Sequence, residues 1–279
     1  MACSSSGLGH RLLRPKTRVR LPYTLPTKDL MQISCWDVDN TLVRSHDYYD
    51  EGYRQASRKF FGPKNEFVMT RRPDGSPERD FSKLTTSELL ERRLHELGID
   101  SSQVDPVEFY RVLSEFAKDF VKKEEIYVYP GVEEVLAGMG ERGKNIIITS
   151  GPRELQLVVL ETTGLREHFN LGQSYFFGDY INKRQVLEKI LQEPETESVV
   201  FFGDAPSEMA AVKQASYPEG KYGIAVGVTV EGLSTAEELK AAGADEIIQA
   251  YSPEVLRELD IINERFREGR LGDRGPERI

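Results

Sequence analysis

The chain contains no apolar run that approaches the ~20 residues of a transmembrane helix. Its longest apolar stretches, at residues 146–148 and 199–202, have only the length of buried strands. Cysteine is also scarce, since only Cys3 and Cys35 occur among 279 residues. Two cysteines, one near the start and one inside an expected strand, argue against a disulfide framework and fit a reducing compartment. We therefore expect no membrane partner and no stabilising disulfides.

Basic residues are in deficit, because 37 Lys and Arg face 46 Asp and Glu and the formal net charge is -9. Nucleic acid binds to basic surfaces, so this balance argues against nucleic acid as the main partner. The composition is otherwise that of a folded globular protein, with 39% hydrophobic residues. The length suits one domain with a further segment inserted into it.

Acidic residues are absent from residues 1–28, which hold six Lys and Arg residues. An acid-free, Ser- and Arg-rich beginning is typical of a transit peptide, and it lacks the apolar core of a secretory signal. A disordered tail or a start codon placed too early explains it as well, because Met31 lies directly before the first expected strand. We expect a disordered basic tail and a cytoplasmic protein, with an organellar transit peptide as the alternative.

The rest of the chain changes its pattern twice. Residues 31–36 form an apolar strand, and apolar residues then recur at helical spacing from residue 44 to about 128. A segment rich in Pro, Gly and Arg at 62–80 reads as a long loop within this helical stretch. From Tyr129 onward, apolar strands alternate with amphipathic helices.

This alternation predicts the fold class. Strands are expected at 144–149, 175–177, 198–202, 222–228 and 246–248, with helices at 132–140, 153–163, 183–192, 207–215 and 235–242. Continuous apolar strands are typical of a parallel sheet that helices cover on both faces. We therefore expect an α/β fold, a Rossmann-like doubly wound parallel sheet core, formed by residues 29–43 and 129–267. Residues 44–128 would be an all-helical insertion, and residues 268–279 a frayed end.

Two carboxylates follow the first strand at a spacing of two residues, Asp37 and Asp39. The carboxyl ends of parallel strands line the active-site edge of such a sheet, so both can face one crevice. One carboxylate can then act as a nucleophile while the other transfers protons. A calcium loop would require Gly and Glu at the sixth and twelfth positions, where the chain has Leu42 and Tyr48.

Two later strands also end in polar residues. Thr149, Ser150 and Gly151 form a strand-to-helix turn whose hydroxyl and backbone N–H groups suit phosphate, although an ordinary helix start has the same look. Asp204 follows the strand at 198–202 and can hold a metal ion, with Glu208 one helical turn on to support it. An N-cap followed by an acidic residue in the first turn is the alternative for this pair.

Lys183 is expected to begin the helix that leads to the strand at 198–202. A cation at this place can neutralise Asp37 and an incoming phosphoryl group, whereas most lysines are solvated at the surface. Arg184 and Lys189 are further candidates for the same role.

The order of these groups resembles the four motifs of the haloacid dehalogenase superfamily. The residues that match are Asp37, Asp39 and Thr41, then Ser150, then Lys183, then Gly203 and Asp204. The resemblance covers residues 31–43 and about 129–250, and residues 44–128 lie where phosphoglycolate phosphatase-like members carry a helical cap domain. The chain departs from the family pattern in two places: Glu208 stands where many relatives have Asp, and no Pro follows Lys183.

The resemblance implies a magnesium-dependent phosphatase that hydrolyses a small phosphorylated metabolite through an aspartyl phosphate on Asp37. Asp39 would be the acid and base. The Mg²⁺ ligands would be Asp37, the backbone carbonyl of Asp39, and Asp204, with Glu208 supporting them from behind. The groups around the phosphoryl oxygens would be Thr149, Ser150, Gly151 and Lys183.

Other functions stay open on the same resemblance. Dehalogenases and phosphonatases of the superfamily lack the second Asp, so Asp39 favours a phosphatase or a phosphomutase. A mutase usually carries a hinge His further along than His46, and a non-catalytic binding protein on this fold is the remaining alternative. The expected partner is a small phosphorylated substrate, with its identity and the oligomeric state left open.

Several residues of the helical stretch fit two roles equally. Tyr48, Tyr49 and Tyr53 lie near its start and could contact a substrate or pack in a core. Arg71, Arg72 and Arg79 could bind a second anionic group or lie in a solvated loop.

Overall fold

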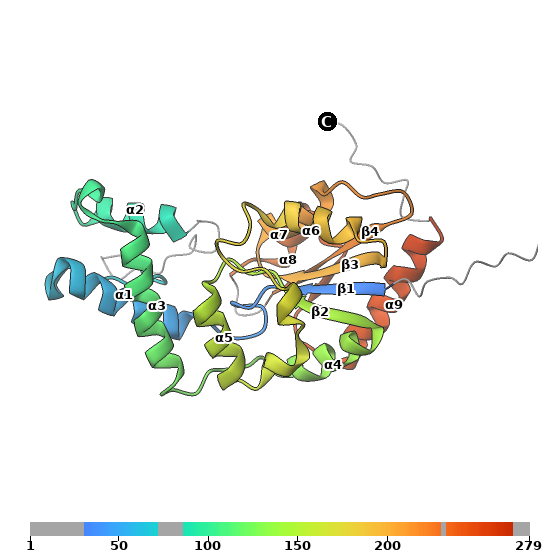
Figure 1. Ribbon diagram of the computed structural model, residues 1–279, viewed down its shortest axis with the longest axis horizontal. Coiled ribbons are helices and arrows are strands. Elements are labelled where there is room, and N and C mark those ends of the chain that lie inside the picture. The colour runs from blue at the N-terminus through green and yellow to red at the C-terminus, as the bar shows by residue number, and fades with distance from the viewer. Residues whose placement is uncertain (1–30, 72–85, 230–232, 270–279) are drawn as a thin grey trace, which may run out of the picture.

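The computed structural model describes residues 31–71, 86–229 and 233–269 (Figure 1). The expectations of a disordered tail or transit peptide at 1–28 lie outside the described residues. So do positions 72–80 of the expected long loop and all but two positions of the expected frayed end.

Five parallel strands form one sheet in the order β2-β1-β3-β4-β5. The strands are β1 (Met31–Trp36), β2 (Gly143–Ile147), β3 (Thr196–Gly203), β4 (Tyr222–Val228) and β5 (Glu246–Ile248). The central strands are buried on both faces, which explains why they read as continuous apolar runs. Because β1 lies between β2 and β3, the strand order reverses there, and such a switch point is where α/β sheets bind ligands.

Helices cover both faces of the sheet, so the predicted doubly wound α/β fold class is confirmed. Two separate buried clusters fill the spaces between the sheet and its helices. One face carries α4 (Val132–Arg142), α5 (Arg153–Thr162) and α9 (Pro253–Arg267), and the other carries α6 (Lys183–Gln192), α7 (Pro206–Gln214) and α8 (Ala236–Ala241). In the part of the chain that the structure describes, no helix has both the length and the apolar character needed to cross a membrane.

The strand expected at 175–177 is instead a single bridge between Tyr175 and Ile148. The backbone N–H of Tyr175 donates to the carbonyl of Ile147 at 2.7 Å, so the pairing exists but does not continue. It stops because the Asp179 carboxylate accepts from the backbone N–H of Phe176 at 2.9 Å and closes a turn there. The segment between α5 and α6 otherwise holds only the short turns η4 (Leu165–His168) and η5 (Leu171–Gln173).

The described chain between β1 and α4 is helical and forms a helical insertion with its own buried cluster. Its elements are α1 (His46–Phe61), η1 (Pro63–Asn65), α2 (Thr86–Glu96), η3 (Ser101–Gln103) and α3 (Pro106–Val121). Two segments connect it to the core and run antiparallel, since Val43 and Val128 form an antiparallel bridge and the N–H of Arg44 donates to the carbonyl of Tyr127 at 2.9 Å.

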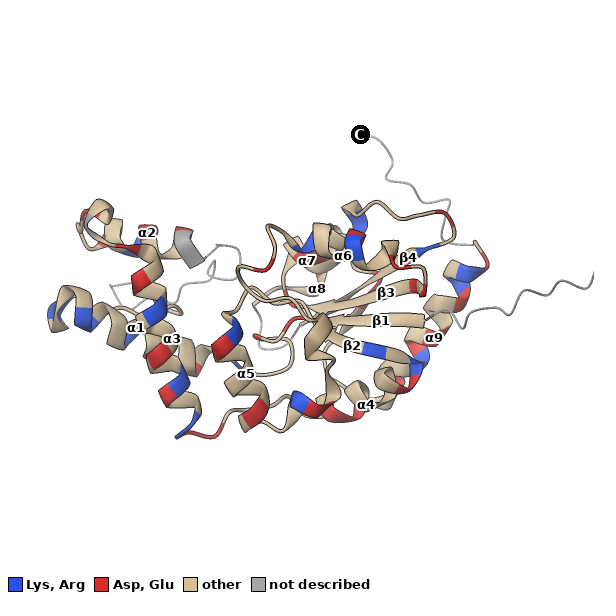
Figure 2. Ribbon diagram, in the orientation of Figure 1, with Lys and Arg blue, Asp and Glu red and all other residues tan. Residues whose placement is uncertain are grey.

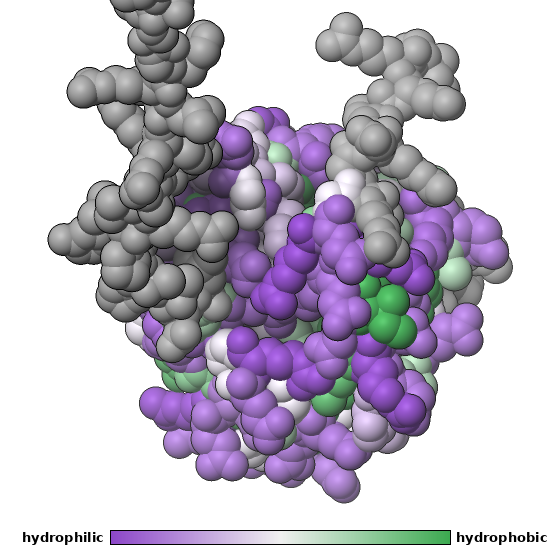
Figure 3. Space-filling model, turned by 90° about the vertical axis from the view of Figure 1, so that its right-hand side faces the viewer, coloured by the Kyte–Doolittle hydropathy of each residue, from purple (hydrophilic) through white to green (hydrophobic). Residues whose placement is uncertain are grey.

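The insertion extends from the carboxyl ends of the strands, on the left in Figure 1. The opposite end of the core is mostly hydrophilic where Figure 3 leaves it visible. The switch point between β1 and β3 therefore faces the helical insertion and not the far end of the molecule.

Candidate active site

Asp37 directly follows β1 and is held at the switch point. Its backbone N–H donates to the carbonyl of Phe202 in β3 at 3.0 Å. Just before it, Trp36 stacks on Phe202 with ring centroids 3.7 Å apart, and the indole N–H donates to Asn145 at 3.1 Å. These contacts lie in the fully packed core, so they fix the backbone from which the Asp37 carboxylate projects.

Lys183 begins α6, and its ammonium lies between two carboxylates. Its Nζ is 2.6 Å from Oδ1 of Asp37 and also contacts Oε1 of Glu208. All three side chains are nearly buried, with 11%, 8% and 7% of their surface exposed. Burial alone would lower the pKa of Lys183, but the two carboxylates raise it above its ordinary value. The lysine therefore stays charged beside the Asp37 carboxylate.

The two other candidate cations are occupied away from the site. Arg184 points its guanidinium at Glu188, with Nε 2.8 Å from Oε1. Lys189 lies over the ring of Tyr175, at 5.3 Å from its centroid. Both follow Lys183 on α6, but only Lys183 among the three faces Asp37 in the described structure.

Asp204 and Glu208 bring further negative charge to the same edge, and Figure 2 shows acidic residues at the carboxyl ends of the central strands. Both residues are buried. Burial, and then the charges of Glu208 and Asp37, raise the pKa of Asp204 well above its usual range. Burial also raises the pKa of Glu208 to about 7, although Lys183 opposes the shift. The Lys183 ammonium contacts Asp37 and Glu208 but not Asp204, and no described side chain donates a hydrogen bond to the Asp204 carboxylate.

This excess of buried negative charge fits a divalent cation. Mg²⁺ prefers carboxylate and carbonyl oxygens and keeps several of its waters. Asp37 and Asp204 offer such oxygens at one sheet edge, and the backbone carbonyl of Asp39 is the expected third ligand. Among the described residues, no three His, Cys, Asp or Glu side chains converge as a ready-made metal cluster. The donor set therefore suits a hydrated hard ion and not a metal enclosed by protein ligands.

Gly203 lets Glu208 reach Lys183. Glu208 also accepts from the backbone N–H of Ala205 at 3.1 Å, so its carboxylate both begins α7 and faces the site. A Cβ added at Gly203 would overlap this carboxyl group. Glycine is needed here for close approach, because the Glu208 side chain folds back over the end of β3.

Gly203→Ala is expected to push Glu208 away from Lys183. We expect kcat on a phosphate ester to fall by ~10- to 100-fold and stability to fall by about 1–3 kcal/mol, because the site has no spare volume. Steady-state kinetics and denaturant unfolding measure the two effects. Gly140→Ala is the matched control, since a Cβ there meets only Asn145 at 3.5 Å. Wild-type kinetics in Gly203→Ala would show that the position of Glu208 does not matter.

Asp39 receives three hydrogen bonds from side chains. Its Oδ1 accepts from the hydroxyl of Tyr48, and its Oδ2 accepts from Tyr49 at 3.1 Å and from the Gln156 amide at 2.7 Å. Burial, and then the charge of Asp37, raise the pKa of Asp39 to about 7, although these hydrogen bonds lower it. A carboxyl group of this kind can both give and accept a proton near neutral pH.

The turn that carries Asp39 is rigid. Asn40 has a left-handed backbone (φ 60°), a conformation that Asn tolerates better than most residues. Its side-chain oxygen accepts from the Ser45 hydroxyl at 3.0 Å. The buried carbonyl of Thr41 accepts from the Tyr251 hydroxyl at 2.7 Å. The turn between β1 and the helical insertion is therefore fixed from both sides.

The residues of the predicted phosphate-binding turn differ in their exposure. Thr149 is buried, and its hydroxyl accepts from the backbone N–H of Gly151 at 3.1 Å, so it shapes the turn from within. Ser150 is exposed at the end of the turn. Gly151 lies against Gln156, and a Cβ added to it would overlap the amide. Within the turn, Ser150 is the residue whose hydroxyl is accessible to a ligand.

Sequence reasoning missed Gln156 as a site residue. A signal was present, because Gln156 falls among Leu155, Val159 and Leu160 on the buried face of α5.

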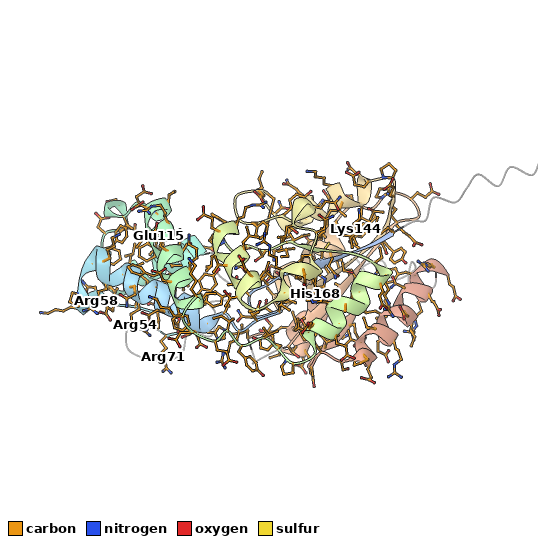
Figure 4. All side chains as sticks on the ribbon, turned by 60° about the horizontal axis from the view of Figure 1, so that its bottom comes forward. Arg54, Arg58, Arg71, Glu115, Lys144 and His168 are labelled. Atoms are coloured by element: carbon orange, nitrogen blue, oxygen red, sulfur yellow. The ribbon has the colours of Figure 1, made fainter. Side chains whose placement is uncertain are left out.

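The arginines that could bind a second anionic group have different outcomes. Arg72 and Arg79 lie outside the described residues, and Figure 4 shows Arg71 on the insertion, pointing away from the core. The structure therefore gives Arg71 no place at the site.

Solved structures of similar fold align with most of this chain. CbbY from Rhodobacter sphaeroides, in complex with phosphate, is 19% identical over 79% of this chain and 95% of its own, with a TM-score of 0.59. A predicted phosphoglycolate phosphatase from Haemophilus somnus 129PT is 15% identical over 84% and 98%, with a TM-score of 0.59. A candidate β-phosphoglucomutase from Thermotoga maritima is 23% identical over 84% and 99%, with a TM-score of 0.55. At these identities the likeness supports the fold.

The sequence comparisons address the family directly. A comparison with curated proteins gave no match. A family model described as haloacid dehalogenase-like hydrolase matches residues 31–216, which is more than half of the chain. The match begins with β1 and continues through α7, so it spans the four motifs and the helical insertion. The chain therefore belongs to the haloacid dehalogenase-like hydrolase family.

Proposed function

We propose that the protein is a magnesium-dependent phosphatase that hydrolyses a small phosphorylated metabolite through an aspartyl phosphate on Asp37. The contact between Lys183 and Asp37, at 2.6 Å beside the buried Asp204, carries this proposal. It joins a nucleophile, a cation for the phosphoryl group and a metal ligand at the switch point of the sheet. A charge-matched site of this kind is what phosphoryl transfer requires.

The positions of the side chains support the following chemistry. The Asp37 carboxylate attacks phosphorus while the bond to the leaving oxygen breaks, and Asp39 gives its proton to that oxygen. Asp39 next takes a proton from water, which attacks the aspartyl phosphate and releases inorganic phosphate. Lys183 and Ser150 bind phosphoryl oxygens in both steps. When bound, Mg²⁺ offsets the repulsion between the carboxylate and the phosphate dianion.

Residues 44–128 are proposed to act as a cap over this site. The helical insertion lies beyond the carboxyl ends of the strands, and two antiparallel segments connect it to the core (Figure 1). Closing it would exclude bulk water during transfer, and opening it would release the product. The leaving group would face the cap, so the cap would set the substrate preference. One structural neighbour, CbbY, was also solved with xylulose-(1,5)bisphosphate, which supports a small phosphorylated substrate.

Phosphate release is expected from 4-nitrophenyl phosphate and from members of a panel of phosphorylated metabolites. Excess chelator should abolish it, and Mg²⁺ should restore it. Ca²⁺ should support it poorly, because its larger and looser coordination shell alters the geometry of attack. Activity that is undiminished in excess chelator would refute the magnesium requirement. Transfer of phosphate between positions of one substrate, without release, would show a phosphomutase.

A further inference from the structure

Asp39 is held by side chains from two different parts of the molecule. Tyr48 and Tyr49 belong to α1 of the helical insertion, whereas Gln156 belongs to α5 of the core. The Gln156 amide also lies 3.4 Å from the Tyr49 hydroxyl, so the donors contact each other as well as the carboxylate. We call this set of three residues the Asp39 cage.

The Asp39 cage does not contribute to stability in the way that ordinary core packing does. Tyr48 and Gln156 are fully buried, and the Oε1 atom of Gln156 has no hydrogen-bond partner among the described residues. A buried polar atom without a partner destabilises the fold, and an apolar residue would suit this face of α5 better. Because Gly151 has no side chain, the Gln156 amide can occupy the space beside it. The amide is therefore placed for its hydrogen bond to Asp39 and not for packing.

The chemistry of the donors suits a group that changes its protonation state within one reaction. A tyrosine hydroxyl can donate to an oxygen of the carboxylate and also to an oxygen of the neutral acid, so the proton of the acid stays free for the leaving oxygen. Two such hydroxyls can hold Asp39 in one orientation both before and after it gives its proton. A group that keeps its orientation transfers its proton faster than a misaligned group does.

We propose that Tyr49 and Gln156, together with Tyr48, are positioning residues that aim the Asp39 carboxyl group at the leaving oxygen. This inference rests on the proposed function. Because the two tyrosines belong to the helical insertion, the orientation of the acid follows the position of α1 relative to the core. The acid would be aligned when the insertion is seated and released from alignment when α1 moves away.

The test compares two esters whose leaving groups differ in their need for a proton. Nitrophenolate leaves readily without one, whereas the phenolate of phenyl phosphate gains more from an acid. Tyr49→Phe should lower kcat/KM for phenyl phosphate by ~10-fold or more, while kcat/KM for 4-nitrophenyl phosphate changes much less. The ratio of the two values is unaffected if part of the sample is unfolded, since both esters see the same enzyme.

Tyr53→Phe is the matched control. Tyr53 lies on the same helix and is fully buried, whereas Tyr49 is half-buried, and the Tyr53 ring packs against Phe67 and Phe109 in the insertion. The ratio for the two esters should be unchanged in this variant. Equal losses on both esters in Tyr49→Phe would overturn the proposal, because a merely structural role acts on both reactions alike.

A double variant separates this inference from the proposed function. Asp39→Asn removes the acid, so adding Tyr49→Phe to it should cause no further loss on phenyl phosphate. A further loss equal to that of the single variant would overturn the positioning role. A wild-type protein that releases phosphate neither from these esters nor from the panel of phosphorylated metabolites would instead refute the proposed function itself.

Discussion

Asp37→Asn is expected to abolish phosphate release, with kcat reduced by roughly 10⁴-fold or more, as for the loss of other catalytic nucleophiles. The amide is nearly isosteric with the carboxylate, so it can occupy the same place beside Lys183. It is a poor nucleophile, however, and it is a weaker ligand for a hard cation. The fold should survive, because Trp36 and Phe202 hold the backbone at this point and neither changes. Phosphate release, together with thermal unfolding of the same sample, measures both expectations.

The matched control for this prediction is Asp260→Asn. Asp260 also pairs with a cation, since its Oδ2 lies 2.7 Å from Arg142, but the pair is on the surface of the core and half of the Asp260 side chain is exposed. That variant should keep wild-type turnover. Intact mass measurement adds a second readout, because a phosphoenzyme formed by the wild type should be missing in Asp37→Asn. Substantial turnover by pure, folded Asp37→Asn would refute Asp37 as the nucleophile.

The local pattern of the sequence was sufficient for the core and for the residues that follow its strands. The helix expected at 183–192 and the strand expected at 222–228 are found at those residues. Continuous apolar runs identify buried strands without any knowledge of their neighbours. Because parallel strands align their carboxyl ends, the residue after each strand could be assigned to one edge. Lys183 thus reaches Asp37 although the usual Pro does not follow it.

Contacts between distant segments were beyond such reasoning. The three hydroxyl groups at Tyr48, Tyr49 and Tyr53 look alike in sequence, yet two of them reach Asp39 and the third does not. Which tyrosine turns toward Asp39 depends on how α1 packs against the core, and no local pattern encodes that. Helix α9 is a different case: Ser252 and Pro253 are an ordinary helix start, so a local pattern for this helix is present in the sequence.

Lys183→Met is expected to impair both activity and stability. Without the ammonium, the buried carboxylates of Asp37 and Glu208 lose their shared partner, and breaking a buried pair costs about 3–5 kcal/mol. The phosphoryl oxygens lose a cation as well, so kcat should fall by ~10²- to 10³-fold. Mg²⁺ should raise the unfolding temperature of the variant by more than that of the wild type. The reason is that a bound cation would replace part of the missing positive charge and would no longer compete with the lysine.

Lys189→Met controls for the loss of a lysine from the same helix. Lys189 is exposed and lies over Tyr175, so its removal should change the free energy of unfolding by less than ~0.5 kcal/mol and leave turnover intact. The Mg²⁺ response of Lys183→Met is the decisive measurement, because lost packing alone would leave it equal to that of the wild type. An equal response would mean that the ammonium and the metal ion do not act on the same carboxylates, which would separate Lys183 from the phosphate and metal site.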